Sequence, residues 1–226
     1  MKEQIRIAVV YTGMPVSLVD NIESQIKKAL DERAVTFLSL SDPSIIADAV
    51  KNGSPSKEAA KRLFFLYQTA VMQGADIVYN ACSSVGDIAE DAKPAFARMG
   101  VPFIRIDEYM ARKAVLEHRR IGVLATLSST LEPTKRLIEK VAREEGRDIT
   151  ITGALADGAF GLSSDELSAV LIEKARSVSG ETDCILLAQG SMGSSKKAIE
   201  NATGKPVYDS PSHGALAVAE IANEIF

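Results

Sequence analysis

Cys82 is the residue of this sequence best placed for acid–base or covalent chemistry. It follows the apolar run Asp76 to Asn80 and precedes a small polar turn, Ser83-Ser84-Val85-Gly86, after which a helical pattern begins. We therefore expect the thiol at the carboxyl end of a strand and near a helix N-terminus, whose partial positive charge favours thiolate over thiol. A thiolate can abstract a proton or add to an electrophilic carbon. The alternative is that Cys82 is a small buried apolar residue, as many free cysteines are.

Polar, hydroxyl-rich segments follow several apolar runs of the chain. Ser83 and Ser84 bring two hydroxyls and several backbone amides to the turn after Cys82, which suits a carboxylate or a developing enolate oxygen. A second such segment is Gln189-Gly190-Ser191-Met192-Gly193-Ser194-Ser195, whose glycines permit a close backbone approach to a ligand. It matches neither a Walker loop nor a GxGxxG motif. These two segments, together with Thr126 and Thr12 after two other apolar runs, predict a pocket for a small oxyanion. The alternative is that the hydroxyls only cap the helices that follow.

The sequence gives less support for a catalytic role of the remaining cysteine and the two histidines. Cys184 begins its apolar run, away from the ligand-binding end, so we interpret it as structural. His118 lies in a charged stretch and is expected to face solvent. His213 begins the last helical pattern, where it would tend to stay neutral and could shuttle protons, although a surface histidine at a helix start is the alternative.

The elements that must position these residues alternate along the chain. Runs rich in Val, Ile and Leu, nearly continuous in several cases, suit strands covered on both faces, and amphipathic patterns between them predict helices. This alternation indicates an α/β fold with mostly parallel sheets flanked by helices. The predicted strands are Ile5 to Val10, Val35 to Leu40, Asp76 to Asn80, Pro102 to Ile106, Ile121 to Ala125, Ile149 to Thr152, Cys184 to Ala188 and Pro206 to Tyr208.

Start and stop signals give limits for several helices. Pro94 is expected to split or kink the helix after Cys82. Ser163 and Glu166 have the spacing of a capping box at the start of a helix. The predicted helices are Val16 to Glu32, one opened by Ser54-Pro55 and stopped by Gly74, one from Leu131 to about Gly146, one from Ser163 through Ser177, and one from Ser212 to Phe226.

The two halves of the chain also resemble each other. The run Ile5 to Val10 and the later Cys82 segment have counterparts of similar spacing in Ile121 to Ala125 and the Gln189 segment. Two similar lobes facing each other would place Cys82 and Gln189 across one cleft. The alternative is that chains built from repeated strand–helix units resemble one another in general.

Composition excludes several classes of protein. The 226 residues carry a net charge of −4 with no long block of one sign, which argues against a nucleic-acid binder. No apolar stretch approaches the length of a membrane helix, and the N-terminus lacks the pattern of a signal peptide. The two cysteines form no CxxC pair or Cys/His cluster, so we expect no zinc site and a cytoplasmic protein with reduced thiols.

Four segments together resemble the aspartate/glutamate/hydantoin racemase superfamily. Gly74 to Ser84 resembles its first cysteine motif, and Thr182 to Gly193 resembles its second. Pro206 to Ser210 matches the short strand that follows, and Gly122 to Thr126 is similar to the opening of the second lobe. The resemblance covers nearly the whole chain in the right order.

This resemblance implies two pseudo-symmetric α/β lobes with an active-site cleft between them, and no PLP or metal. It implies a first lobe of residues 1–103 joined by the C-terminal helix, 209–226, and a second lobe of residues 104–208. In family racemases, two cysteines face each other across the substrate, and one removes the α-proton while the other returns it. Cys82 matches the first cysteine, whereas Gln189 occupies the second position and Ser191 lies near the place of a histidine that often follows. A glutamine side chain has no useful pKa for proton transfer, so this position departs from the family's two-thiol pattern and disfavours two-sided racemisation.

The leading hypothesis is therefore a cofactor-independent, racemase-like isomerase acting on a small carboxylic acid or amino-acid-like substrate. Cis–trans isomerisation, in which the thiol adds to a double bond, and decarboxylation are alternatives that the resemblance implies. A non-catalytic protein that binds a small molecule is the alternative from another class. We expect a homodimer or higher homo-oligomer without nucleic-acid or membrane partners. The catalytic candidates are Cys82, Gln189 and His213, and the substrate-binding candidates are Thr12, Ser83, Ser84, Thr126, Gly190 and Ser191.

Overall fold

The computed structural model describes residues 4–13, 16–31 and 33–225 of the chain. These residues form two four-stranded sheets, and the chain divides into two compact units. The first unit extends up to Ile106 and resumes at Gly214, and the second is Asp107–His213. The limits of 103 and 208 inferred from the sequence fall a few residues before these divisions.

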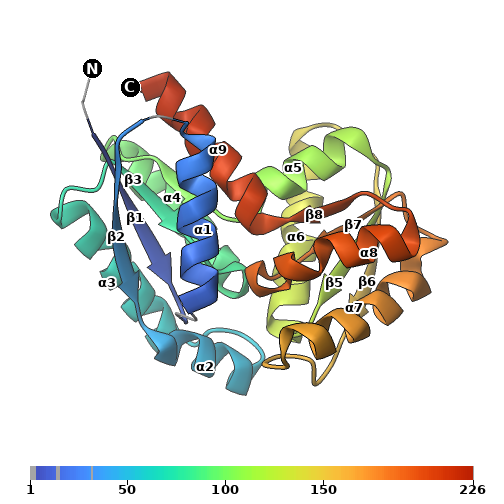
Figure 1. Ribbon diagram of the computed structural model, residues 1–226. Helices are drawn as coiled ribbons and strands as arrows, with labels where there is room; N and C mark the ends of the chain where they lie inside the picture. The colour runs from blue at the N-terminus through green and yellow to red at the C-terminus, as the bar shows by residue number, and fades with distance from the viewer. Residues whose placement is uncertain (1–3, 14–15, 32, 226) are drawn as a thin grey trace. The chain divides into compact units, whose positions relative to one another are not determined.

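In the first unit, strands β1 (Ile5–Tyr11), β2 (Val35–Ser41), β3 (Ile77–Asn80) and β4 (Phe103–Arg105) form a parallel sheet in the order β2-β1-β3-β4. The helices between them are α1 (Val16–Ala29), α2 (Pro43–Asn52), α3 (Lys57–Met72) and α4 (Gly86–Arg98). The last helix of the chain, α9 (Ser210–Ile225), contributes its greater part to this unit. Parallel strands need such crossovers, so helices cover both faces of the sheet (Figure 1).

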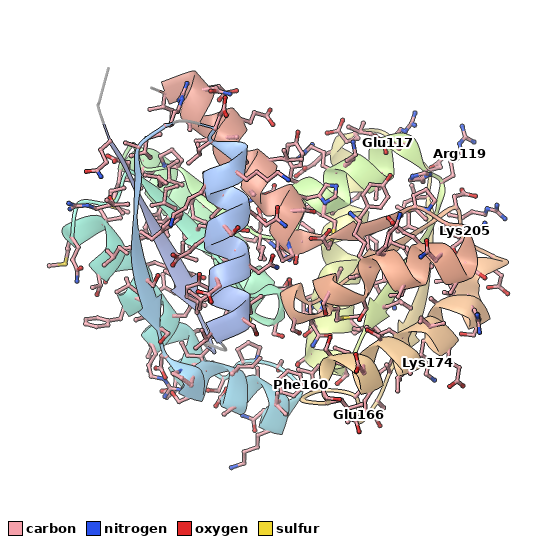
Figure 2. The ribbon with its side chains drawn as sticks, viewed as in Figure 1. Glu117, Arg119, Phe160, Glu166, Lys174 and Lys205 are labelled. Atoms are coloured by element: carbon pink, nitrogen blue, oxygen red, sulfur yellow. The ribbon has the colours of Figure 1, made fainter. Side chains whose placement is uncertain are left out.

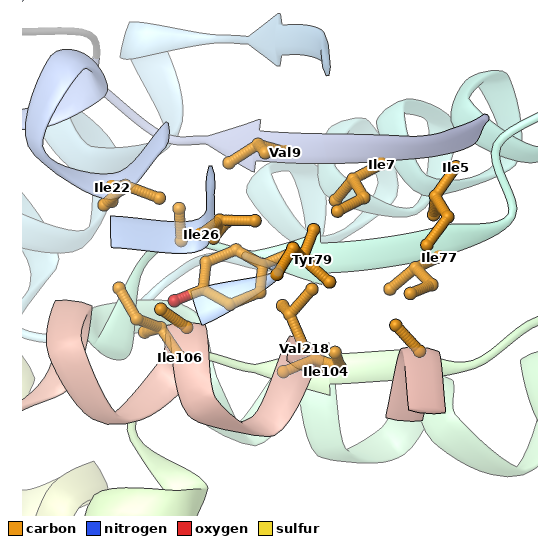
Figure 3. Close-up of a cluster of buried hydrophobic side chains, with 14 of the residues drawn as sticks. Ile5, Ile7, Val9, Ile22, Ile26, Ile77, Tyr79, Ile104, Ile106 and Val218 are labelled. Atoms are coloured by element: carbon orange, nitrogen blue, oxygen red, sulfur yellow. The ribbon is translucent and has the colours of Figure 1, made fainter. Parts of the chain in front are cut away.

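The core of the first unit has two layers, one on each face of the sheet. On one face, alternate β1 side chains such as Ile7 and Val9 pack with Ile26 of α1 and Val218 of α9 (Figure 3). On the other face, side chains of α3 and α4, among them Leu63, Tyr67 and Phe96, pack against the intervening β1 and β3 residues. This two-sided burial explains why β1 is apolar almost without interruption.

The second unit repeats this arrangement. Strands β5 (Arg120–Ala125), β6 (Thr150–Leu155), β7 (Cys184–Leu187) and β8 (Val207–Asp209) form a parallel sheet in the order β6-β5-β7-β8. Helices α5 (Glu108–Glu117) and α6 (Ser128–Glu144) cover one face, and α7 (Ser164–Ser179) and α8 (Lys196–Thr203) cover the other. Strand order is therefore the same in both sheets, and the predicted fold class of two parallel-sheet units flanked by helices is confirmed.

All eight predicted strands are present, with ends that differ by a few residues. The capping box at the start of α7 is also present, with Ser163 and Glu166 bonding reciprocally. Three helices were not among the predicted ranges: α2, which Asp42 caps at its N-terminus, α5 and α8. Glu32 and Phe226, predicted as helix ends, lie outside the described residues.

Pro94 does not split its helix. Helix α4 runs without interruption from Gly86 to Arg98 with Pro94 inside it. Ala92 and Phe96, on either side of Pro94, are buried and pack in the core cluster on this face of the sheet. This packing outweighs the backbone hydrogen bond that a proline removes. Among the described residues, no helix is both long and apolar enough to cross a membrane.

Candidate active site

Cys82 lies at the carboxyl end of the first sheet, as its position in the sequence predicted. It is the second residue after β3 and immediately precedes a short 3-10 helix, Ser83–Val85, which runs into α4. Its side chain is half-buried. The Thr12 hydroxyl, which follows β1 in the neighbouring position of the sheet, hydrogen-bonds to the thiol, as do the backbone N–H groups of Ser84 and Val85. The turn therefore surrounds the sulfur with hydrogen-bond donors.

Burial nevertheless dominates the ionisation of this thiol. Burial raises the pKa of the Cys82 thiol above its ordinary value, and the hydrogen bonds from Thr12, Ser84 and Val85 lower it by a smaller amount. The expected lowering of the Cys82 pKa near a helix N-terminus is thus smaller than the opposing effect of burial. The resting group is a neutral thiol whose anion has donors already in place.

Ser83 supplies a second feature of the turn. Its side chain is 4% exposed, and its hydroxyl has no hydrogen-bond partner among the described residues. A buried hydroxyl without a partner costs roughly 1–3 kcal/mol, and a bound ligand or water that accepts its proton would recover that cost. The turn after β3 therefore offers a hydroxyl and a thiol that a bound oxyanion could use.

Two residues that the sequence interpretation did not assign to the site support the Cys82 turn. Asn80, the last residue of β3, donates from its side-chain amide to the Cys82 carbonyl over 2.9 Å. The Tyr67 hydroxyl in turn donates to the Asn80 side-chain oxygen over 2.8 Å, and both side chains are fully buried. A polar asparagine within an otherwise apolar strand was the signal available for this pair. Together they fix the backbone at which the thiol is attached.

Gln189 has the equivalent place in the second unit. It is the second residue after β7, precedes the 3-10 helix Gly190–Ser195, and has an extended backbone like that of Cys82. Its side-chain oxygen accepts from the Thr126 backbone N–H over 2.6 Å, and its amide nitrogen lies 2.8 Å from the Thr126 hydroxyl. Thr126 follows β5 as Thr12 follows β1. Each unit thus pairs a threonine with the residue after the adjoining strand, and the structure brings Thr12 together with Cys82, and Thr126 together with Gln189.

His213 lies in the first turn of α9 and is 7% exposed, so the interpretation as a surface histidine is wrong. Its Nδ1 lies 2.9 Å from the Asp209 carbonyl oxygen, which can only accept a proton. Nδ1 therefore carries a hydrogen, and the neutral ring presents Nε2 as an acceptor. Burial lowers the pKa of His213, and the nearby positive charge of Lys196 lowers it further, although hydrogen bonding to Asp209 opposes both effects.

The side chain of Asp209 anchors this turn. It accepts from the backbone N–H of Ser212 over 2.9 Å and from Lys196 Nζ over 3.1 Å. Burial alone would raise the pKa of Asp209, but the Ser212 and Lys196 contacts outweigh it and hold the pKa below its usual range. The Lys196–Asp209 ion pair therefore places two charged groups at the end of β8. The sequence interpretation did not recognise this pair.

His118 and Cys184 belong to the structure of the second unit. His118 is half-buried rather than solvent-facing, and its Nε2 lies 2.8 Å from the Tyr208 hydroxyl, which donates to Glu117. Cys184 is fully buried at the start of β7, the opposite end of the strand from Gln189. Burial, and then the charges of Asp183 and Glu117, raise the pKa of Cys184 to about 12. It is therefore an unreactive thiol in the core.

Comparison with known proteins identifies the family of this chain. The family model for Asp/Glu/hydantoin racemases matches residues 12–218, which include both threonine-paired strand ends. The chain belongs to this family. It is accordingly an enzyme of the isomerase class, in agreement with the sequence interpretation. No curated protein matches it.

Solved structures share the fold over nearly the whole chain. Glutamate racemase from Francisella tularensis in complex with D-glutamate superimposes with a TM-score of 0.75 at 14% identity, covering 99% of this chain and 82% of that one. Allantoin racemase from Klebsiella pneumoniae gives a TM-score of 0.66 at 18% identity, covering 97% and 88%. The maleate isomerase Iso from Pseudomonas putida gives 0.65 at 14% identity, covering 97% and 93%. These likenesses establish the fold of this racemase-family chain.

Proposed function

We propose that this enzyme isomerises a small carboxylic acid without a cofactor, and that Cys82 is its catalytic acid–base or nucleophilic group. The observation that carries the proposal is the set of donors around the Cys82 sulfur, namely the hydroxyls of Thr12 and Ser84 and the backbone N–H groups of Ser84 and Val85. Such donors stabilise the thiolate when it forms, although burial keeps the resting thiol neutral. Small acids are the substrates that the racemase family implies.

The substrate's carboxylate would bind at the turn after Cys82. The hydroxyl of Ser83 is buried and has no partner among the described residues, whereas the hydroxyl of Ser84 already hydrogen-bonds to the Cys82 thiol. A carboxylate oxygen there would accept the Ser83 hydrogen bond, and binding would thereby remove an unsatisfied polar group. Thr12 would line the same turn and hold the sulfur in place.

Gln189 and the turn that follows it would supply neutral hydrogen-bond donors. Gln189 cannot accept or release a proton at useful pH, and its oxygen is engaged by Thr126. The remaining amide hydrogen of Gln189, with Gly190 and Ser191 after it, would orient the substrate or a water. His213, whose neutral Nε2 is an acceptor, would serve as a proton shuttle that takes up a proton and later returns it to the substrate.

Two reaction types fit one thiol. In the first, the Cys82 thiol gives its proton to a base such as His213 or water, the thiolate removes the α-proton and becomes a thiol again, and the protonated base then returns a proton to the enediolate. In the second, the thiolate adds to a carbon–carbon double bond, the new single bond rotates, and expulsion of the thiolate restores the alkene. The name of the maleate isomerase that shares the fold is consistent with the second type. Decarboxylation followed by protonation of the enediolate from the thiol is a third outcome that a single cysteine allows.

The decisive experiment is proton NMR of small mono- and dicarboxylates, amino acids, hydantoins and aryl malonates with the enzyme in deuterated water. It detects α-proton exchange, isomerisation and decarboxylation together. On the acid that reacts, Cys82→Ser should lower turnover by several orders of magnitude, because a hydroxyl is a far weaker base and nucleophile than a thiolate. Cys184→Ser is the matched control and should leave turnover nearly unchanged. Cys82→Ser activity within a few-fold of the parent would overturn the thiol mechanism.

A further variant separates the roles of the two strand ends. Gln189→Cys restores a thiol at the position equivalent to Cys82, and α-proton exchange should then appear on both faces of an amino-acid substrate. If Gln189→Cys shows only the stereochemistry of the parent, Gln189 does not contact the substrate as proposed.

A further inference from the structure

Arg105, the last residue of β4, is a fully buried arginine at the carboxyl end of the first sheet. It is 2% exposed and is the largest of the fully buried side chains among the described residues. Arg119, by contrast, is exposed and projects from the surface (Figure 2). An arginine is almost never fully buried unless it is paired, because removing its charge from water is costly. No step proposed for Cys82 uses this buried charge.

The fold brings Arg105 beside the Cys82 turn. Where β3 and β4 pair, Arg105 lies opposite Asn80, whose side chain donates to the Cys82 carbonyl. The guanidinium packs against the backbone of Gly86, since a Cβ built on that glycine would lie 2.6 Å from Arg105 Cζ. Gly86 is the first residue of α4 and follows Val85, whose backbone N–H donates to the Cys82 thiol. The buried cation therefore contacts the start of the helix whose preceding turn carries the donors to the sulfur.

Other charged groups accompany Arg105 at this end of the sheet. Glu90 of α4 has a carboxylate oxygen 3.8 Å from Arg105 Nη1, and the same oxygen lies 3.2 Å from Lys93 Nζ. Asp87 lies in the first turn of α4, and Asp107, two residues after Arg105 in the chain, is fully buried. The buried cation thus has a carboxylate partner, as a charge removed from water requires.

Tyr67 shows that Arg105 and Cys82 lie close to the same buried group. Its hydroxyl donates to Asn80, the residue opposite Arg105 in the sheet. Burial raises the pKa of Tyr67 well above its ordinary value, the charge of Cys82 raises it further, and the charge of Arg105 opposes both effects. The guanidinium and the thiol are therefore near enough to one hydroxyl for the charge of each to be felt there.

We propose that Arg105 is a positioning residue of the active site, whose buried positive charge at the start of α4 stabilises the Cys82 thiolate when it forms. A fixed cation favours the ionised form of a nearby thiol, and a charge acts more strongly in a buried site than in water. In the resting protein, burial still outweighs this effect and the thiol is neutral. The inference rests on the proposed function only for the catalytic role of Cys82, because the effect on the thiol needs no substrate.

The test is the rate of Cys82 alkylation by iodoacetamide as a function of pH, followed by mass spectrometry. Arg105→Gln should lower this rate about three- to tenfold at neutral pH, because loss of a nearby positive charge reduces the thiolate population. Glu90→Gln removes a negative charge from the same group and should raise the rate about two- to threefold, a smaller effect because Glu90 is partly exposed. Arg62→Gln is the matched control on α3, where the arginine is exposed and paired with Asp42, and should leave the rate unchanged.

Opposite effects of the two variants, with all curves converging above the thiol pKa, distinguish a charge effect from a loosened turn. The inference is overturned if Arg105→Gln and the parent give the same curve, or if their rates still differ at high pH. If urea unfolding shows that Arg105→Gln does not fold, Glu90→Gln decides, and a rate equal to or below that of the parent overturns the inference. Turnover by Cys82→Ser tests the proposed function separately. Should that variant keep the parent's activity, Cys82 is not catalytic, whereas the alkylation curves still decide whether Arg105 acts on its thiol.

Discussion

Replacing Thr12 by valine should suppress the reactivity of the Cys82 thiol while keeping the shape of the site. Thr12 is 3% exposed, and its hydroxyl hydrogen-bonds to the sulfur and lowers the pKa of Cys82 against the larger, opposite effect of burial. A hydrogen bond to a charged group stabilises it by about 1.5–3 kcal/mol, and sulfur is a weak acceptor, so the lower end applies. Because 1.36 kcal/mol corresponds to a factor of ten, the thiolate population at neutral pH should fall about tenfold.

The assay is the rate of Cys82 alkylation by iodoacetamide as a function of pH, followed by mass spectrometry. Cys184 does not interfere, because it is fully buried and its pKa is raised to about 12. The rate should be about tenfold lower in Thr12→Val at neutral pH, and the two curves should converge once the pH exceeds both thiol pKa values. Thr126→Val, the equivalent change in the second unit, is the control and should leave the curve of the unliganded protein unchanged. Superimposable curves for parent and Thr12→Val at every pH would refute the reasoning.

Three further predictions concern stability, measured by urea unfolding. Tyr67→Phe should cost about 1–2 kcal/mol, because it leaves the buried side-chain oxygen of its partner without a donor; an unchanged midpoint would contradict this. Gly214→Ala should cost about 1–3 kcal/mol, because its Cβ would lie 2.1 Å from the Tyr79 hydroxyl oxygen, whereas Gly180→Ala, with no atom within 4 Å, should be neutral or slightly stabilising. His213 has a folded-state pKa below its ordinary value, so the unfolded chain binds its proton first and stability should fall as the pH drops below about 6.5. His213→Gln should flatten that decline, and an identical pH dependence would exclude His213 as its source.

The strands were predictable from sequence because their burial on both faces produces continuous apolar runs. Helices cover both faces of each sheet, so β1, β5 and β7 are apolar almost without interruption. The helix α2 was missed although Asp42 and Pro43 form a start signal and Gly53 a stop signal. Its ten residues are too few to show a clear helical period between two stronger elements. Short helices are identified by their caps rather than by periodicity.

The candidate site was predictable in position but not in electrostatics. The residues after β3 and β7 follow from the rule that ligands bind at the carboxyl ends of parallel strands. The protonation state of Cys82 does not follow, because it depends on the balance between a helix N-terminus and burial, and burial is a property of the folded chain. The same holds for His213, whose neighbours Asp209 and Lys196 come from β8 and α8 and are brought to it by the fold.

The supporting contacts of the site were beyond sequence reasoning for a geometric reason. Tyr67 and Asn80 are 13 positions apart and belong to different elements. Nothing in their spacing shows that α3 crosses the sheet where the Tyr67 hydroxyl meets β3. Only the packing of α3 on the sheet brings the two side chains within 2.8 Å.

The place of α9 in the chain has a consequence for the order in which the protein can assemble on the ribosome. The second unit is one uninterrupted segment, Asp107–His213, whereas the first unit is completed only by residues from Gly214 onward. Ala215, Val218 and Ala222 of α9 form part of its core, against strands that were synthesised some two hundred residues earlier. During synthesis, the second unit can therefore close its core while the first still exposes apolar surface of β1 and β3. The half of the protein that leaves the ribosome first is the half that finishes folding last, and it is the one that needs protection from aggregation in the interval.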